Sequence, residues 1–368
     1  MRPQLKPGLL PLWRDTDTVQ IGIDPRRAAA LTGLGTAAAV LSLLDGSRDA
    51  DELTRTAQAY GISAATTSHV LGLLASAGVL NDFPASLHKF LPEYLRARLA
   101  PEMACASLAY GDGDGGARTI ARRRAAFVRV YGAGRIGACL ATFLAASGIG
   151  RVTCLDSGVA EPADLAPAGL GTGDIGARRS DGVARAIARI APETATADHP
   201  HLVPDLAVLT GPVAPAEVEA LMRDRVAHLA VRADEAIGVV GPLVEPGRSA
   251  CLRCINLHKA ARDPAWPKIL AQTGAGAGSG AGVGAGPVPA ACDTVLAAAT
   301  AALASAQALA VIDGCGPRPP AATNGTLELF LPEWQWRRRT WVPVATCTCG
   351  AAEHPLDGRE NNHRARSA

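Results

Sequence analysis

Residues 127–156 constrain the fold of this chain more than any other stretch. They read FVRVYGAGRIGACLATFLAASGIGRVTCLD, which predicts a strand, a glycine-rich turn, a helix and a second strand. Gly132, Gly134 and Gly137 form a G-x-G-x-x-G motif, and Asp156 ends the second strand. In nucleotide-binding units of this pattern the glycines let backbone N–H groups approach a phosphate, and the acid accepts hydrogen bonds from a ribose. The same glycines also fit a simpler interpretation, in which they only allow tight strand–helix packing.

The alternation of strands and helices continues to about residue 350. We expect a helix over 177–190, a buried strand over 206–210 and a closing hairpin over 326–342. Between them we expect a helix at 216–225 and strands at 229–232 and 237–244. The alanine-rich run 295–312 could be mistaken for a membrane span, but its polar residues favour a buried helix. Together these segments predict a Rossmann-like α/β domain over 126–350.

Two close cysteine pairs predict a metal site. Cys251 and Cys254 form a C-x-x-C, and Cys347 and Cys349 follow about ninety residues later. Four thiolates suit one tetrahedral structural Zn²⁺ with no open position for catalysis, which would bind the C-terminal segment to the domain. A reduced redox pair is the alternative interpretation, and His258 could substitute for one of the four ligands.

The first 82 residues read as a small separate domain. A hairpin over 9–23, three short helices and an apolar return at 79–80 predict a winged-helix arrangement. Thr36, the pair Asp49 and Glu52, and Ser63 are expected to cap the three helices. The helix that would enter a DNA groove, 63–77, contains no Arg or Lys, so DNA binding is disfavoured and peptide capture at a sheet edge is expected instead.

The length and composition of the chain limit the number of domains and the classes of protein that remain possible. A chain of 368 residues is expected to form two domains, here joined by a linker over 83–125 and followed by a disordered tail over 351–368. Lys and Arg (36) nearly balance Asp and Glu (34), which excludes a strongly basic nucleic-acid coat. The N-terminus lacks the pattern of a secretory signal, so we expect a cytoplasmic protein with no membrane partner.

The glycine motif, Asp156, the C-x-x-C, the alanine-rich helix and the late cysteine pair together resemble the ThiF/MoeB family, which is related to ubiquitin-activating enzymes. The resemblance covers about residues 126–350 and implies a ThiF-type adenylyltransferase fold that binds ATP and Mg²⁺. It also implies that Arg179 lies near the place of a phosphate-contacting lysine. Residues 1–82 resemble the PqqD-like element that binds leader peptides. The combination is similar to the ThiF-like partner proteins that deliver peptides to YcaO-type enzymes.

Two features of that family are missing. An Asn-Leu-x-Arg stretch is replaced by residues 163–167, which contain no arginine, and a Thr-Asp-Asn segment is replaced by Thr210-Gly211-Pro212. Loss of an arginine and of the magnesium-binding acid would weaken transition-state stabilisation. We therefore predict a peptide-binding protein with a degenerate adenylation site, which presents a leader peptide to a YcaO-type enzyme.

The alternative is an active adenylyltransferase that activates a carboxylate of a carrier protein or peptide. In that case Arg178 and Arg179 would contact the phosphates, Asp164 would replace the magnesium ligand, and Cys292 would be a candidate acceptor of an acyl group. An NAD-dependent oxidoreductase is disfavoured by the cysteine pairs and by the lack of a recognisable catalytic dyad. By analogy with relatives of the family, a homodimer is expected.

Overall fold

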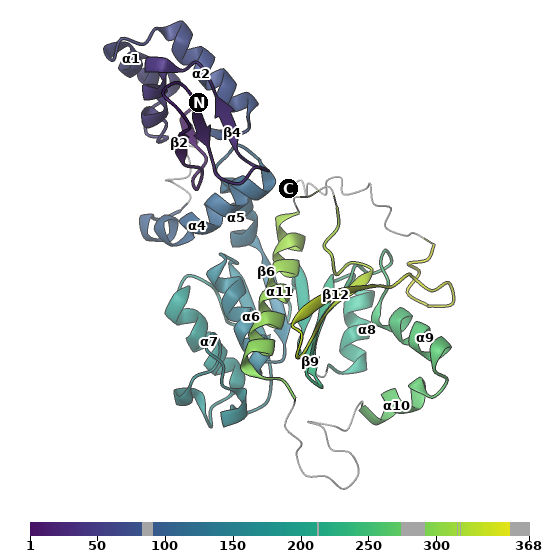
Figure 1. Cartoon of the computed structure of the whole chain (residues 1–368). Coiled ribbons are helices and arrows are strands. Elements are labelled where there is room, and N and C mark those ends of the chain that lie inside the picture. The colour runs from purple at the N-terminus through teal and green to yellow at the C-terminus, as the bar shows by residue number, and fades with distance from the viewer. Residues whose placement is uncertain (83–90, 212, 274–290, 315, 317, 354–368) are drawn as a thin grey trace. The chain divides into compact units, whose positions relative to one another are not determined.

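The computed structural model describes residues 1–82, 91–211, 213–273, 291–314, 316 and 318–353. The chain divides into two compact units, Met1–Ala121 and Arg122–Ala368 (Figure 1). The expected mobile loop after residue 273 and most of the expected tail lie outside the described residues.

The N-terminal unit contains two small antiparallel sheets. Strand β1 (Pro3–Leu5) pairs with β5 (Leu80–Asp82), which confirms the expected return of the chain. The other sheet has the order β2-β3-β4, with bounds Pro11–Trp13, Val19–Ile21 and Ala29–Leu31. The pairing of β2 with β3 confirms the predicted hairpin.

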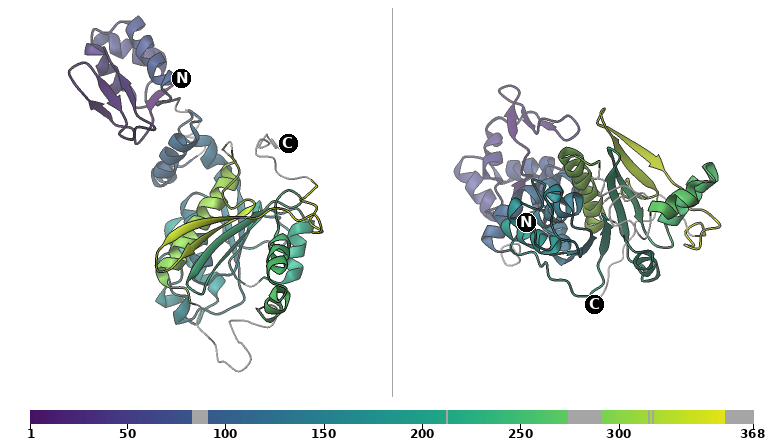
Figure 2. Two further views of the ribbon diagram at one scale, coloured as in Figure 1. Left: turned by 45° about the vertical axis from the view of Figure 1, so that its right-hand side comes forward. Right: turned by 90° about the horizontal axis from the view of Figure 1, so that it is seen from below.

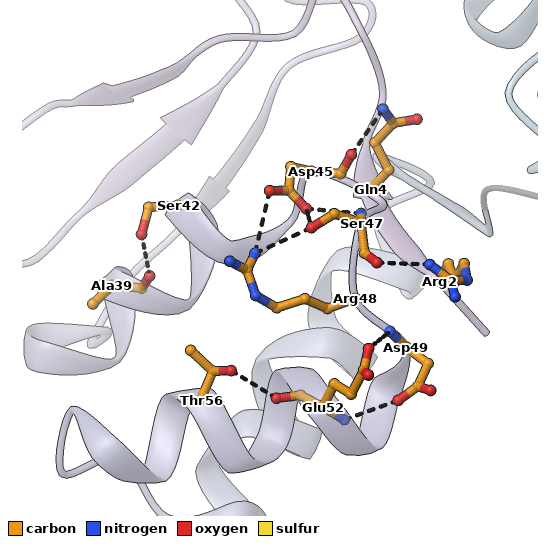
Figure 3. A network of polar contacts seen from close by, with 10 residues as sticks. All are labelled: Arg2, Gln4, Ala39, Ser42, Asp45, Ser47, Arg48, Asp49, Glu52 and Thr56. Atoms are coloured by element: carbon orange, nitrogen blue, oxygen red, sulfur yellow. Dashed lines mark hydrogen bonds and ion pairs between the residues drawn. The ribbon is translucent and has the colours of Figure 1, made fainter.

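Three helical segments pack beside these sheets: η1 (Gly35–Leu43), α1 (Ala50–Ala59) and α2 (Ala64–Ser76). The capping box of Asp49 and Glu52 is confirmed, with both reciprocal hydrogen bonds in place (Figure 3). Ser63 accepts a hydrogen bond from the N–H of Thr66, as predicted.

The predicted cap by Thr36 is wrong. The first helical segment is a 3₁₀ helix whose N-cap position is Leu34, with no side-chain cap of its own. Instead, Oδ1 of Asp17 accepts a hydrogen bond from the N–H of Gly35 at 2.9 Å. The carboxylate of Asp17, in the loop of the β2–β3 hairpin, therefore accepts from the first N–H group of this helix. It replaces the expected local cap although it lies 18 residues away in the sequence.

The described part of the expected linker is helical. Helix α4 (Glu93–Tyr110) and helix α5 (Ala117–Ala125) follow the first helices. An apolar cluster, formed by Leu91, Leu95, Leu99, Met103 and Ile120, joins them. Because these side chains are buried, this part of the chain has a small core of its own.

The second unit is built on a seven-stranded sheet with the order β12-β11-β10-β9-β8-β6-β7. Strands β6 (Phe127–Tyr131), β7 (Arg151–Leu155), β8 (Leu206–Leu209) and β9 (His228–Asp234) are parallel. Strands β10 (Ile237–Val244), β11 (Gly325–Phe330) and β12 (Gln335–Thr340) continue the sheet antiparallel. The mostly parallel sheet confirms the predicted Rossmann-like α/β domain, and β11 with β12 is the predicted closing hairpin.

Helices cover both faces of this sheet (Figures 1 and 2). The side that carries the main core cluster packs against α6 (Arg135–Ala146), α7 (Arg179–Ile190) and α11 (Thr294–Asp313). On the other side, Ala207 and Leu209 pack against α8 (Pro215–Arg223). Helices α9 (Leu252–Arg262) and α10 (Trp266–Thr273) follow β10.

Helix α11 is the one helix of the described residues that is long and apolar enough to cross a membrane. Its Ala297, Ala301, Ala304 and Ala308 are nevertheless buried in the main core cluster of the unit, and Leu296 is also buried. Packing against the sheet and α6 therefore accounts for the apolar face that these residues form, as the sequence predicted for a helix of the core.

A buried ion pair holds the C-terminal end of α11. Arg123 donates through Nε and an Nη atom to the two carboxylate oxygens of Asp313, each at 2.8 Å, and the two side chains are 7% and 0% exposed. Arg123 also donates to the carbonyl of Ser147, just after α6. The pair thus connects the start of this unit with the ends of two core helices.

We predict that Arg123→Ala lowers the free energy of unfolding of the α/β unit by about 3 kcal/mol, because the buried Asp313 carboxylate would lose the two hydrogen bonds and the charge of this guanidinium. Urea denaturation measures this change. Arg232→Ala is the matched control, because it breaks an ion pair with Asp234 whose side chains are 55% and 47% exposed and should cost less than about 1 kcal/mol. Equal effects of the two substitutions would contradict the assigned role of Arg123.

Candidate nucleotide and metal sites

The glycine motif lies where the sheet reverses its strand order. The chain passes from β6 to the neighbouring β7. On the other side of β7, Ala195 forms a parallel bridge with Arg151, and the chain then returns past β6 to form β8. Ligands of open α/β sheets bind at such a switch point, outside the carboxyl ends of the strands. The turns after β6, β7 and β8 bring Gly132, Asp156 and Thr210 to this place.

The three glycines have different roles. Gly132 has a φ of +97°, and a Cβ on Gly137 would lie 2.0 Å from the carbonyl oxygen of Gly132, so the turn needs glycine at both positions. Thr210 strengthens the turn by donating to the carbonyl of Gly132 at 2.9 Å. A Cβ on Gly134, in contrast, would meet only Oδ1 of Asp164, at 3.7 Å. Gly132 and Gly137 thus fit the packing interpretation, whereas Gly134 is the glycine that faces the site.

Asp156 lies against the glycine loop. Its Oδ2 accepts from the N–H of Ala133 at 2.7 Å, and its Oδ1 accepts from the N–H of Gly158 at 2.7 Å. These bonds fix the carboxylate at the end of β7, where the sequence predicted a ribose-binding acid. That ribose contact stays a prediction.

Arg179 joins the two carboxylates of the site. Its Nε donates to Oδ2 of Asp164 at 2.7 Å, and an Nη atom lies 3.8 Å from Oδ1 of Asp156. Asp164 Oδ2 also accepts from the N–H of Glu161. Arg178, the second arginine expected at the phosphates, is the exposed N-cap residue of α7. The structure thus brings Arg179 and Asp164 together at the site.

Sequence reasoning missed Arg135, the first residue of α6. Its Nε donates to the carbonyl of Ala163 at 2.7 Å, and an Nη atom donates to the carbonyl of Cys292 at 2.9 Å. Its position inside the glycine motif was the available signal. Arg135 thus places a second guanidinium beside the turn that carries Asp164.

Cys292 does not have the surroundings of an activated thiolate. Burial raises the pKa of its thiol, although the charge of Arg135 acts in the opposite direction. A thiol with a raised pKa is mostly protonated near neutral pH and is a weak nucleophile. The expected acyl-accepting role of Cys292 therefore gains no support from its environment.

The backbone of the loop fits a nucleotide in part. Gly134 is the N-cap of α6, and no side chain caps this helix, so the N–H groups of its first turn point toward the site without an acceptor in the described part of the chain. If ATP were bound, these N–H groups and Arg179 would hold phosphates, and Asp156 the ribose. If a magnesium ion were bound, Asp164 would be its candidate ligand beside Asp156, because Thr210-Gly211 supplies no acid.

The four predicted metal-binding cysteines meet in one cluster. Their sulfur atoms all lie within 4.8 Å of one another, with Cys251–Cys254 at 3.8 Å, Cys251–Cys347 at 3.7 Å and Cys254–Cys349 at 3.6 Å. Four sulfurs about 2.3 Å from a central Zn²⁺ would lie about 3.8 Å apart, so the geometry suits a tetrahedral ion. The N–H of Val344 donates to Cys254 Sγ, a contact typical of metal-bound thiolates.

His258 is not part of this cluster. Its Nε2 lies 2.9 Å from the carbonyl oxygen of Val342. Burial raises the pKa of Cys347 to about 11 and also raises that of Cys251, so these two thiols hold their protons at neutral pH without a metal, whereas hydrogen bonds to Cys254 lower the pKa of its thiol in spite of its burial. A cation would have to displace these protons, and acid should therefore release it.

Comparisons with known proteins agree with this fold. Residues 113–214 match the sequence model of the ThiF family. A search of curated protein sequences gave no significant match. Among solved structures, E. coli MccB with MccA-N7isoASN is 15% identical with a TM-score of 0.65, and the match covers 95% of this chain and 100% of that one.

Two further structures have the same fold. E. coli MccB with ATP is 16% identical with a TM-score of 0.64, over 95% of this chain and 99% of that one. PaaA is 15% identical with a TM-score of 0.65, over 91% of this chain and 99% of that one. At these identities the similarity establishes the fold, and it extends over the N-terminal unit as well as the α/β unit.

The glycines give a testable contrast. We expect Gly137→Ala to lower the free energy of unfolding by about 1–3 kcal/mol, because the new methyl group would collide with the Gly132 carbonyl. Gly134→Ala meets no such obstacle and should leave stability within about 0.5 kcal/mol. Thermal or urea unfolding of the two variants measures these changes in stability. Equal losses of stability would contradict the different roles assigned to these glycines.

The cysteine cluster predicts one zinc ion per chain. Elemental analysis of the purified protein should find it, and Cys347→Ser should lose it and lower the unfolding temperature. Cys105→Ser is the control, because Cys105 is exposed and far from the cluster in sequence. A wild-type protein without metal, or a Cys347→Ser variant that keeps it, would contradict the prediction.

Proposed function

We propose that this chain is a peptide-binding ThiF-type protein of peptide natural-product modification that does not itself adenylate. In this proposal the N-terminal unit binds a leader peptide in the manner of a PqqD-like element. The protein then presents the substrate to a YcaO-type enzyme. The observation that carries the proposal is the Arg179–Asp164 ion pair at the glycine loop, because it occupies the arginine on which phosphate binding would depend.

The N-terminal sheet supports peptide capture. Strand β4 lies at one edge of the β2-β3-β4 sheet, and the segment Ala28–Ala30 carries only alanine side chains, which leave the edge accessible. Ala30 is exposed, and its pairing opposite Gln20 in the β3–β4 ladder places its N–H on the outer side. An extended peptide can pair with such an edge. Helix α2, which lacks Arg and Lys, offers no comparable surface for DNA.

The solved relatives support the peptide-modification context. MccB is the microcin C7 biosynthetic enzyme, and its structures contain N-formylated MccA or MccA-N7isoASN. A partner of comparable chemistry is proposed here for this chain. A cytoplasmic location and a homodimer belong to the same proposal.

An active adenylyltransferase is the second candidate. The intact glycine loop, the uncapped start of α6 and the similarity to MccB with ATP favour it. In that case Asp164 would bind Mg²⁺ and Arg179 would turn to the phosphates. The substrate would be the carboxylate of a peptide or carrier protein.

Two measurements on the full chain separate the candidates. We expect fluorescence anisotropy to show binding of a precursor peptide encoded beside the gene, weakened about tenfold or more by Ala30→Pro, which removes the outward N–H of β4. Trp13→Ala on the opposite edge strand is the control and should bind normally.

We also expect no peptide-dependent exchange of labelled pyrophosphate into ATP. Exchange that is lost in Asp156→Ala would refute the non-adenylating proposal and establish the second candidate.

A further inference from the structure

A carboxylate of the protein itself lies beside the glycine of the loop that faces the site. Oδ1 of Asp164 lies 3.7 Å from the position that a Cβ on Gly134 would take, directly at the glycine that faces the site. The side chain of Asp164 is only 14% exposed. The start of α6 has no side-chain cap, so its N–H groups and helix dipole favour an anion at this place.

Asp164 is fixed here from three sides. Arg179 donates to its Oδ2, the N–H of Glu161 donates to the same oxygen, and Arg135 donates to the carbonyl of the preceding residue, Ala163. A carboxylate held by these contacts cannot move away without breaking its ion pair. It would also repel a phosphate on the loop, since two negative charges would lie a few ångströms apart.

We propose that Asp164 keeps nucleotide phosphates off the glycine loop, and that loss of its charge opens a binding site for a nucleoside diphosphate. Without that charge, the loop N–H groups face an empty anion site and Arg179 is free to turn toward a phosphate. This inference deepens the proposed function. It rests on that proposal only in treating the glycine loop as a nucleotide site. It gives the loss of adenylation a specific cause in one residue.

Calorimetric titration of the full chain with ADP in the presence of EDTA tests the inference. Asp164→Asn keeps an oxygen that can accept from the Glu161 N–H but removes the charge. We expect it to bind ADP at least about tenfold more tightly than the wild type, as the removal of a like charge at this range predicts. Asp181→Asn, which removes an exposed charge from the first turn of α7, is the matched control and should bind as the wild type does.

The double variant Asp164→Asn with Arg179→Ala should lose the gain, because the released arginine is part of the new site. Asp164→Ser serves as a second charge-removing variant if the asparagine variant does not fold. No gain in either variant, or an equal gain in Asp181→Asn, would overturn the inference. It would also be overturned if Mg²⁺ alone raised wild-type ADP affinity to that of Asp164→Asn, since Asp164 would then be a metal ligand. Failure of the proposed function would appear separately, as pyrophosphate exchange by the wild type.

Discussion

The ion pair between Arg179 and Asp164 is the interaction on which the proposed behaviour of the glycine loop depends. The pair joins the start of α7 to the short turn at residues 161–164, and through Asp156 it reaches the end of β7. Arg135 completes the arrangement from the loop itself. Arg179 and the two aspartates thus form an ion-pair network without a ligand, in a place where helix α6 and the loop would otherwise favour a bound anion. A site that is electrostatically satisfied in this way gains less from a phosphate than an open loop would.

The rest of the fold holds this arrangement in place. The parallel strands set the three turns side by side, and Thr210 on the turn after β8 bonds to the carbonyl of Gly132. The cysteine cluster brings residues 347–349 against the start of α9, so a structural ion there would fix the C-terminal segment to the α/β unit. The buried Arg123–Asp313 pair does the same for the end of α11. The cysteine cluster and the candidate nucleotide site are built from different residues, so a change in one does not require a change in the other.

Local sequence signals predicted the parts of this structure that local interactions determine. The strand–glycine loop–helix–strand order, the buried α11, the final hairpin and the capping box of α1 follow from periodicity and from neighbouring side chains. The cysteine cluster could be predicted because four thiols with this spacing have few other uses in such a chain.

Contacts between segments that are distant in the sequence could not be predicted in this way. Thr36 was expected to cap a helix whose first N–H group instead donates to Asp17. The packing of α4 against α5 within the expected linker is marked by no local sequence motif. Arg135 lies within the glycine motif, yet its partners at residues 163 and 292 depend on the tertiary fold.

A crystal structure of the wild-type protein grown with ATP and Mg²⁺ tests the central claim most directly. The account predicts that Arg179 Nε stays on Asp164, near the present 2.7 Å, and that no phosphate contacts the N–H groups at the start of α6. A triphosphate seated on the glycine loop, with magnesium bound to Asp164 and Arg179 turned to the phosphates, would contradict it.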